Sequence, residues 1–358
     1  MTFLIFLIVL SVLVLAHEWG HFITARRAGA KVEEFGFGFP PRLFSFKRRG
    51  TVFSLNLIPF GGFVKIFGED GEHRGEAGSF GSLKISKRAK IIAAGVTMNL
   101  ILAWFLLSLG NAIGRPAVVE EANAALAQNI TIQVVSVAKG SPADLAGLKN
   151  SDSIVGASLN GQNQSFATAR EFQNFVSSAQ GQNIDLVLKR GDETVTVAVT
   201  PRLDPPAGEG ALGVGLVRVG LIRVPWYAVP VKAVKDVVQL TGAVAYSLAM
   251  FFGSLIFKGQ LMGDVTGPVG IASLAGQAYR MGLSYLIQLT ALLSINLAIL
   301  NILPFPALDG GRLIFLAAEK IKGSPLGQRL ESRVNLVGFA LLLLLMLFVT
   351  WKDIARLF

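Results

Sequence analysis

The sequence predicts an α-helical membrane protein with about four transmembrane helices, a membrane-associated β-hairpin region and an inserted soluble α+β domain. Of its 358 residues, 52% are hydrophobic and only 16% are charged. A typical soluble domain has about 25% charged residues, so this composition indicates a membrane protein. The apolar residues gather in long segments, whereas one central segment shows the alternating pattern of strands. These observations together predict the fold class.

Four segments approach the length of about 20 apolar residues that a helix needs to cross a bilayer. Another segment, Val237 to Phe257, is almost as apolar, and the topology of the chain must decide whether it crosses. The four expected spans run from Thr2 to about Thr24, from Ile91 to about Gly110, from Leu283 to about Pro304, and from Leu336 to about Trp351.

The segment between the first two spans, residues 25–90, has 13 Lys or Arg against six Asp or Glu. An excess of basic residues is typical of cytoplasmic loops, so we expect this segment on the cytoplasmic side. Within it, Thr51 to Ile66 is rich in β-branched and aromatic residues around Pro59, Gly61 and Gly62, which predicts a hairpin with a glycine turn. The segment is too apolar to stay in water, and we expect it to lie against the membrane or dip into it.

Residues 115–227 have a different character, with alternating strand patterns and frequent turn residues. Nine basic and ten acidic residues give this segment no cytoplasmic charge excess, so we expect a soluble domain on the other side of the membrane. The expected organisation is a first membrane half at residues 1–112, the soluble domain at 115–203, a linker and interfacial amphipathic helix at 204–282, and a second membrane half at 283–358.

Composition also limits partners and cofactors. The formal net charge is +10, but the basic residues flank apolar segments and form no patch on a polar domain, so we expect no nucleic acid partner. The chain has no Cys. A metal site would therefore use His and carboxylate ligands.

The first span contains two imidazoles and a carboxylate, His17, Glu18 and His21. An ionisable side chain within a span is costly and is by default a functional hypothesis. Residues four apart lie on one helix face, so His17 and His21 can hold one ion while Glu18 acts as general base, the H-E-x-x-H zinc motif. In the alternative interpretation, both imidazoles simply extend to the interface from the end of a span. That alternative leaves the Glu18 carboxylate unexplained.

A catalytic zinc ion needs a third protein ligand, and Asp309 is the candidate because it follows the third span after two prolines. The alternative is that Asp309 only belongs to a helix-ending turn. Residues 310–333 carry five basic and two acidic residues, which places them on the cytoplasmic side, where His21 also lies. Both predictions agree only if Val237 to Phe257 does not cross the membrane. We therefore expect that segment to be an interfacial or partly inserted amphipathic helix.

Four motifs in this order resemble those of the site-2 protease family of intramembrane zinc metalloproteases, specifically the bacterial RseP-type branch with a PDZ domain. The resemblance covers nearly the whole chain, and the soluble domain resembles a single PDZ domain through VAKGSPADLAGLKNSDSIVGASLNGQ at residues 137–162. The four motifs are AHEWGHF at 16–22, PFGGFVKI at 59–66, AAGVTMN at 93–99 and SINLAILNILPFPALDGGRL at 294–313.

The resemblance implies roles for particular residues. Zn²⁺ would be bound by His17, His21 and Asp309, and Glu18 would be the catalytic base. Asn301 would contact the substrate backbone, and Asn296 is a weaker candidate for which hydrogen bonding between helices is an equally good explanation. The membrane-associated β-element that pairs with an extended substrate would include Gly61, Gly62, Phe63 and Val64.

Two motifs depart from the family pattern. Gly38-Phe39-Pro40 stands where the family has Gly-Phe-Gly, and residues 95–99 read Gly-Val-Thr-Met-Asn where the family has Gly-Pro-x-x-Asn. Pro40 lacks a backbone donor. Neither departure involves an expected zinc ligand, so both concern the handling of substrate.

The implied activity is hydrolysis of peptide bonds within or near transmembrane segments of single-span proteins, such as anti-sigma factors or signal-peptide remnants. The resemblance implies a bacterial cytoplasmic membrane, with both termini and the PDZ domain outside the cytoplasm and the active site near the cytoplasmic side. Partners would be transmembrane substrates, the lipid bilayer, and peptide C-termini or extended segments at the PDZ domain. One alternative is a zinc transporter, which needs further ionisable residues along its spans. The other is a membrane PDZ adaptor with a structural metal, in which Glu18 is dispensable.

Overall fold

The computed structural model divides the chain into two compact units. Unit 1 comprises Met1–Ser108, Pro230–Gly276 and Ile287–Phe358, and unit 2 comprises Leu109–Val229 and Gln277–Leu286. The structure describes residues 1–73, 75–119, 127–191, 193–206, 208–258, 266–325 and 327–355.

Five of the described helices are long and apolar enough to cross a membrane, and the chain is therefore a multi-pass membrane protein. Each consists of an apolar run in which the helix satisfies its own backbone hydrogen bonds, as a lipid environment requires. They are α1 (Thr2–Ala28), α2 (Ile85–Ile113), α5 (Val229–Lys258), α7 (Leu283–Ile302) and α9 (Gln328–Ala355).

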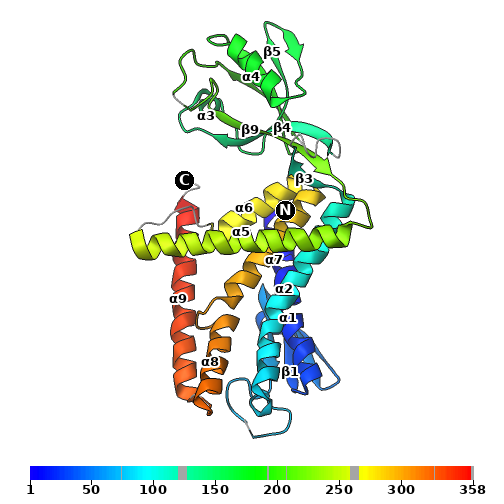
Figure 1. Cartoon of the computed structure of the whole chain (residues 1–358), viewed down its shortest axis with the longest axis vertical. Coiled ribbons are helices and arrows are strands. Elements are labelled where there is room, and N and C mark those ends of the chain that lie inside the picture. Colours follow the sequence, from blue (N-terminus) through cyan, green and yellow to red (C-terminus); the bar gives the residue numbers. More distant parts are fainter. Residues whose placement is uncertain are drawn as a thin grey trace. The chain divides into compact units, whose positions relative to one another are not determined.

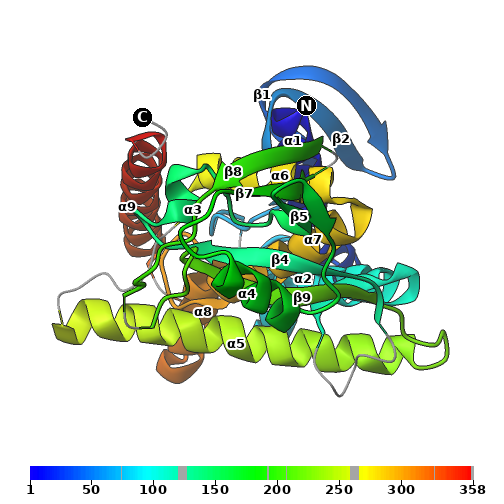
Figure 2. The same cartoon turned by 90° about the horizontal axis from the view of Figure 1, so that it is seen from above.

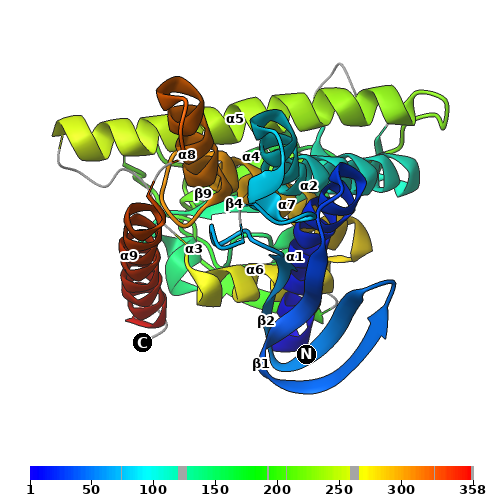
Figure 3. The same ribbon diagram turned by 90° about the horizontal axis from the view of Figure 1, so that it is seen from below.

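Helix α5 is the addition to the four expected spans, and it contains the segment Val237 to Phe257. It runs crosswise to α1 and α9 within the same unit, whereas these two run roughly along one direction (Figures 1, 2 and 3). It is also the helix of the five that the described part of the chain covers least. Length and composition alone therefore admit five spans, and an interfacial position of α5 stays our prediction.

The first and third expected spans run in the same direction. A short helix, α6 (Pro268–Met281), precedes α7, and a Cβ atom on its Gly276 would lie 2.5 Å from the Thr2 side chain. Gly276, which precedes α7 in the chain, therefore lies beside the start of α1 within unit 1. Helix α8 (Asp309–Lys322) follows α7 after an irregular turn and begins at the far end of this pair.

The β-hairpin of unit 1 is larger than expected and folds back on itself. Strand β1 (Val32–Arg48) pairs antiparallel with β2 (Thr51–Ile66), and Arg48 lies opposite Thr51. The predicted change of direction around Pro59, Gly61 and Gly62 is present. Phe37 pairs with Leu55 on one side and with Gly62 on the other, so the first and last parts of β2 run in opposite directions along β1. A second, tight turn lies at Arg49 and Gly50, which both have positive φ, at 48° and 84°, as a two-residue hairpin turn requires. Gly61, with φ of 113°, lies in the stretch where β2 changes direction and its register shifts.

Unit 2 contains a seven-stranded sheet in the order β3-β9-β4-β5-β7-β8, with β6 paired to β5. Helices α3 (Pro142–Leu145) and α4 (Ala169–Ser178) accompany it. The strands are β3 (Arg115–Val118), β4 (Ala127–Val137), β5 (Ser153–Leu159), β6 (Gln162–Gln164), β7 (Ile184–Arg190), β8 (Glu193–Val199) and β9 (Val214–Ile222).

The sheet extends past residue 203, where we expected the soluble domain to end. Strand β9 pairs with both β3 and β4, so the chain returns to the sheet after residues 204–213. Ala211 and Leu212, in the expected linker, are buried in the core of this unit. The glycines of this segment resemble a linker in composition, but the segment leads directly into a central strand.

Candidate metal centre

The structure brings His17, His21 and Asp309 together, although about 290 positions separate the histidines from the aspartate. The Nε2 atoms of the two histidines are 3.1 Å apart. Asp309 Oδ2 lies 3.2 Å from Nε2 of His17 and 3.4 Å from Nε2 of His21. One ligand atom from each residue falls within 4.8 Å of the others, so a single ion can contact all three.

Helix α1 presents the two imidazoles on one face because they are four residues apart. Asp309 is the first residue of α8. The close approach of α8 to the end of α7 requires glycine, since a Cβ atom on Gly310 would lie 2.1 Å from the Leu303 carbonyl oxygen. The sequence Asp-Gly-Gly after the two prolines thus folds the carboxylate back toward α1.

The other ring nitrogens are held by helix α2. His21 Nδ1 is 2.9 Å from the Ile91 carbonyl oxygen. A carbonyl only accepts hydrogen bonds, so this Nδ1 donates and Nε2 of the neutral ring carries a lone pair. The Asn99 side-chain amide is 3.3 Å from His17 Nδ1. With its oxygen turned toward the ring it would accept from Nδ1–H, and Asn99 Oδ1 is a buried atom that otherwise has no partner among the described residues.

The donor set fits a zinc ion. Two imidazole lone pairs face a carboxylate oxygen, His17 and Asp309 are only 8% and 9% exposed, and Asp309 Oδ2 has no hydrogen-bond partner in the described part of the chain. Three mutually repelling lone pairs in a buried place need a cation between them. Two imidazoles and one carboxylate are ligands that zinc prefers, and three protein ligands leave its fourth position open.

Two residues of α2 that sequence reasoning did not assign to the site contribute to it. A Cβ atom on Gly95 would lie 2.3 Å from His21 Nε2 and 2.6 Å from His17 Cε1, so only glycine lets α2 pass this close to the rings. Asn99 is fully buried, and its backbone oxygen accepts a hydrogen bond from Ser294 of α7 at 2.7 Å. The signal that could have revealed Asn99 is a polar residue inside an apolar span.

A cavity of about 370 Å³ opens at this centre. Glu18 and Asn301 line it together with the three expected ligands, as do Phe63 and Val64 of strand β2.

The other expected site residues lie differently. Gly62 is next to the cavity, since a Cβ atom on it would lie 3.5 Å from Glu18 Cγ, and Gly61 faces the Phe39 ring instead. Asn296 is not among the residues that line the cavity. The structure therefore brings Asn301 to the candidate ligands and leaves Asn296 away from them.

Comparison with known proteins adds independent evidence. A family model described as peptidase family M50 matches residues 5–345. The zinc metalloprotease RasP of Oceanobacillus iheyensis is 31% identical, and the alignment covers 100% of this chain and 99% of that protein. The regulator of sigma-W protease RasP of Bacillus subtilis is 32% identical with the same coverage, and the zinc metalloprotease RasP of Shouchella clausii is 30% identical, again with 100% and 99% coverage.

Proposed function

The chain belongs to peptidase family M50, and from this premise we propose that it is a zinc-dependent intramembrane protease. Its proposed substrates are single-span membrane proteins, cut within or near their transmembrane segments. The observation that carries the proposal is a cavity lined by the two imidazoles, by the Asp309 carboxylate as third ligand, by the Glu18 carboxylate and by residues of strand β2. Peptide hydrolysis needs these parts together.

We assign the metal to His17, His21 and Asp309. When bound there, zinc supplies a Lewis acid that polarises the scissile carbonyl and lowers the pKa of a water molecule toward about 7. The α2 residues keep the two rings oriented, because the Ile91 carbonyl and the Asn99 amide hold the Nδ1 atoms.

Glu18 is the proposed general base. Its carboxylate side chain lies in the same cavity as the ligands and beside Gly62 of β2. It takes the proton of the attacking water and passes it to the leaving amine, a contribution of about 10² to 10⁴ in rate. No covalent intermediate with the protein is required.

The substrate is proposed to bind as an extended strand. A transmembrane helix hides its carbonyls in its own hydrogen bonds, so it must unwind before it is cut. Residues Gly61 to Val64 of β2 offer a strand edge beside the metal centre, and Asn301 offers an amide for the opened backbone. Asn296 is the weaker candidate for this role because it does not line the cavity.

The surroundings of the site define the rest of the proposal. We propose a bacterial cytoplasmic membrane, with the metal centre near the cytoplasmic side and the two termini on the other side. Unit 2 is proposed to be a PDZ domain outside the cytoplasm that binds extended segments or C-termini of peptides by strand addition. Its small mixed fold and antiparallel sheet support this proposal.

The test is the substitution Glu18→Gln in the full-length protein, reconstituted in liposomes with a single-span reporter. The cleavage rate should fall by at least about 100-fold while the bound zinc, measured by elemental analysis, stays near one ion per chain. Glu33→Gln is the matched control, since Glu33 pairs with Lys65 on the hairpin and lies outside the cavity. Unchanged cleavage by Glu18→Gln would overturn the role of Glu18. A wild-type protein that binds zinc but cuts no reporter would favour the adaptor or transporter interpretation.

A further inference from the structure

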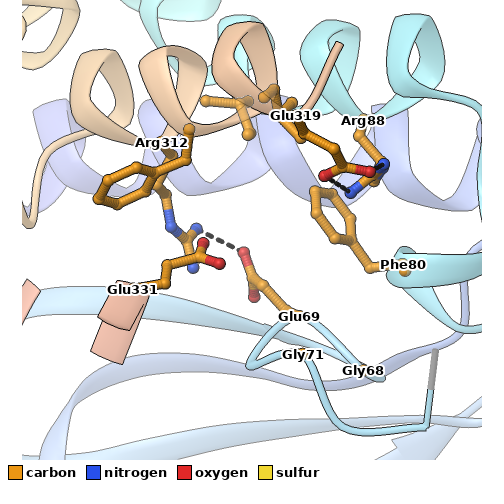
Figure 4. Close-up of a pocket in the computed structure, with 12 residues that line it drawn as sticks. Gly68, Glu69, Gly71, Phe80, Arg88, Arg312, Glu319 and Glu331 are labelled. Atoms are coloured by element: carbon orange, nitrogen blue, oxygen red, sulfur yellow. Dashed lines mark hydrogen bonds and ion pairs between the residues drawn. The ribbon is translucent and has the colours of Figure 1, made fainter. Parts of the chain in front are cut away.

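An ion pair between Arg312 and Glu69 forms part of the wall of the metal cavity. Arg312 Nη1 donates to Glu69 Oε1 at 2.5 Å. Both residues also line a second, smaller cavity of about 30 Å³, shown in Figure 4, so the pair stands between the two spaces. The side chains are 37% and 18% exposed, and neither has a role in the proposed chemistry.

The pair connects α8, which begins with the candidate ligand Asp309, to β2, the strand proposed to pair with substrate. Each partner of the pair lies only three residues from Asp309 or from the end of β2. Arg312 lies three residues after Asp309 in the first turn of α8. Glu69 lies three residues after the end of β2, and its backbone N–H donates to the Ile66 carbonyl at 3.1 Å. A shift of the β2 edge relative to Asp309 would therefore have to break or rearrange this ion pair.

Helix α8 is anchored separately to the rest of the metal centre. Two turns beyond Arg312, Glu319 accepts two hydrogen bonds from Arg88 of α2, at 2.5 and 3.0 Å. Both side chains of this second pair are nearly buried. Figure 4 shows the two pairs at opposite ends of the small cavity. Arg88–Glu319 fixes α8 against α2, and Arg312–Glu69 adds a polar contact between α8 and the hairpin, whose last residue Ile66 also shares an apolar core with Leu316 of α8.

We propose that the Arg312–Glu69 ion pair fixes the register of the substrate strand over the metal centre and thereby selects which peptide bond is cut. The inference rests on the proposed function, in which the substrate pairs with β2. A strand advances about 3.3 Å per residue, and one residue of slip also exchanges the faces of all side chains. Positioning to about 1 Å is what hydrolysis demands, so a loosened β2 edge exposes neighbouring bonds to the site.

The experiment maps cleavage positions by mass spectrometry of reporter products formed by the full-length protein in liposomes. The variants are Glu69→Gln, Arg312→Gln and the charge swap that combines Glu69→Arg with Arg312→Glu. We expect the single variants to spread cleavage over adjacent bonds and to raise the KM several-fold with a smaller change in kcat. The swap should return most cleavage to the wild-type bond.

Arg42→Gln is the matched control, because it removes an arginine ion pair with Glu34 at 2.6 Å on the same hairpin, away from α8. It should cut at the wild-type bond. Zinc content and thermal unfolding identify variants that fail to fold. If Arg312→Gln fails to fold, Arg312→Lys, which keeps the charge, replaces it, and its cleavage should spread over adjacent bonds less than that of Glu69→Gln. Single variants that cut only the wild-type bond would overturn the inference and leave the proposed function intact. A wild-type protein that cuts nothing would instead remove the proposed function.

Discussion

The two units of this protein differ most in the side chains that they leave on their surfaces. Unit 2 follows the rule of water-soluble domains, with a core of aliphatic and aromatic residues such as Phe172, Leu186 and Leu188 that are at most 1% exposed. Unit 1 leaves large apolar residues on its surface, most visibly along α9, and buries polar residues such as Asn99 and Ser294 at its centre.

The difference shows how the surrounding medium decides what holds each unit together. Apolar burial stabilises unit 2 because it removes hydrocarbon from water. Lipid is as apolar as leucine, so unit 1 gains little by hiding its leucines and instead depends on close packing and polar contacts between helices. Substitutions of the same type should therefore have effects of different size in the two units.

The strongest test concerns close packing at the polar centre of unit 1. Gly95→Val places side-chain atoms where the His17 and His21 rings lie, and the rings cannot retreat because Ile91 and Asn99 hold them. We expect reporter cleavage to fall by more than about 100-fold together with loss of bound zinc. Zinc content and cleavage are measured on the same preparation.

The control for that test is a glycine at which an added side chain would meet no neighbouring atoms. Outside its own stretch of α5, no atom of the described residues lies within 4 Å of a Cβ position on Gly242, so Gly242→Val should retain its zinc. Full zinc occupancy in Gly95→Val would show that the rings can move aside and would contradict the packing argument.

The second test removes core volume from unit 2. Leu186→Ala truncates a side chain with 0% exposure in the centre of the sheet, and we expect it to lower the free energy of unfolding of unit 2 by about 2 to 5 kcal/mol. Hydrogen exchange of the amides in β7 and β8 measures this change. Zinc content should not change, because the residue belongs to the other unit.

The third test weakens a polar contact in unit 1 without adding volume. Asn99→Ala removes the amide beside His17 Nδ1, and we expect the zinc affinity to fall by about 10- to 100-fold. Competition with a chelator measures the affinity. Thr97→Ala on the same helix is the control, since its exposed hydroxyl bonds only to the Ala93 carbonyl within α2. Equal affinities for the two variants would show that Asn99 does not support the ring.

The smallest effect is expected for a leucine on the surface of unit 1. Leu344→Ala in α9 truncates a side chain that is 62% exposed, and its environment in a bilayer is equally apolar before and after the unit folds. We expect a change in thermal stability within about 0.5 kcal/mol in liposomes. A loss as large as that of Leu186→Ala would mean that α9 packs against another chain in the membrane.

The sequence by itself determined the class of protein and the candidate ligands on its first helix through two kinds of local pattern. Apolar runs of span length predict membrane helices because a lipid environment tolerates few other backbones. The spacing of His17 and His21 predicts a shared ion because helix geometry alone puts them on one face. Two features were not predicted: the tight turn at Arg49 and Gly50, where both residues have positive φ, and the return of β9 to the sheet. Both depend on which segments pair.

The sequence made Asp309 the candidate for the third ligand, and the tertiary structure decided how it and the residues of α2 meet the histidines. Asp309 reaches the histidines because α7 runs parallel to α1 and glycines let α8 fold back, and no local spacing contains that information. Asn99 and Gly95 join the site because α2 packs against α1 at the depth of the rings. Contacts between helices arise from packing across hundreds of residues, whereas periodicity reports only on neighbours within a few turns.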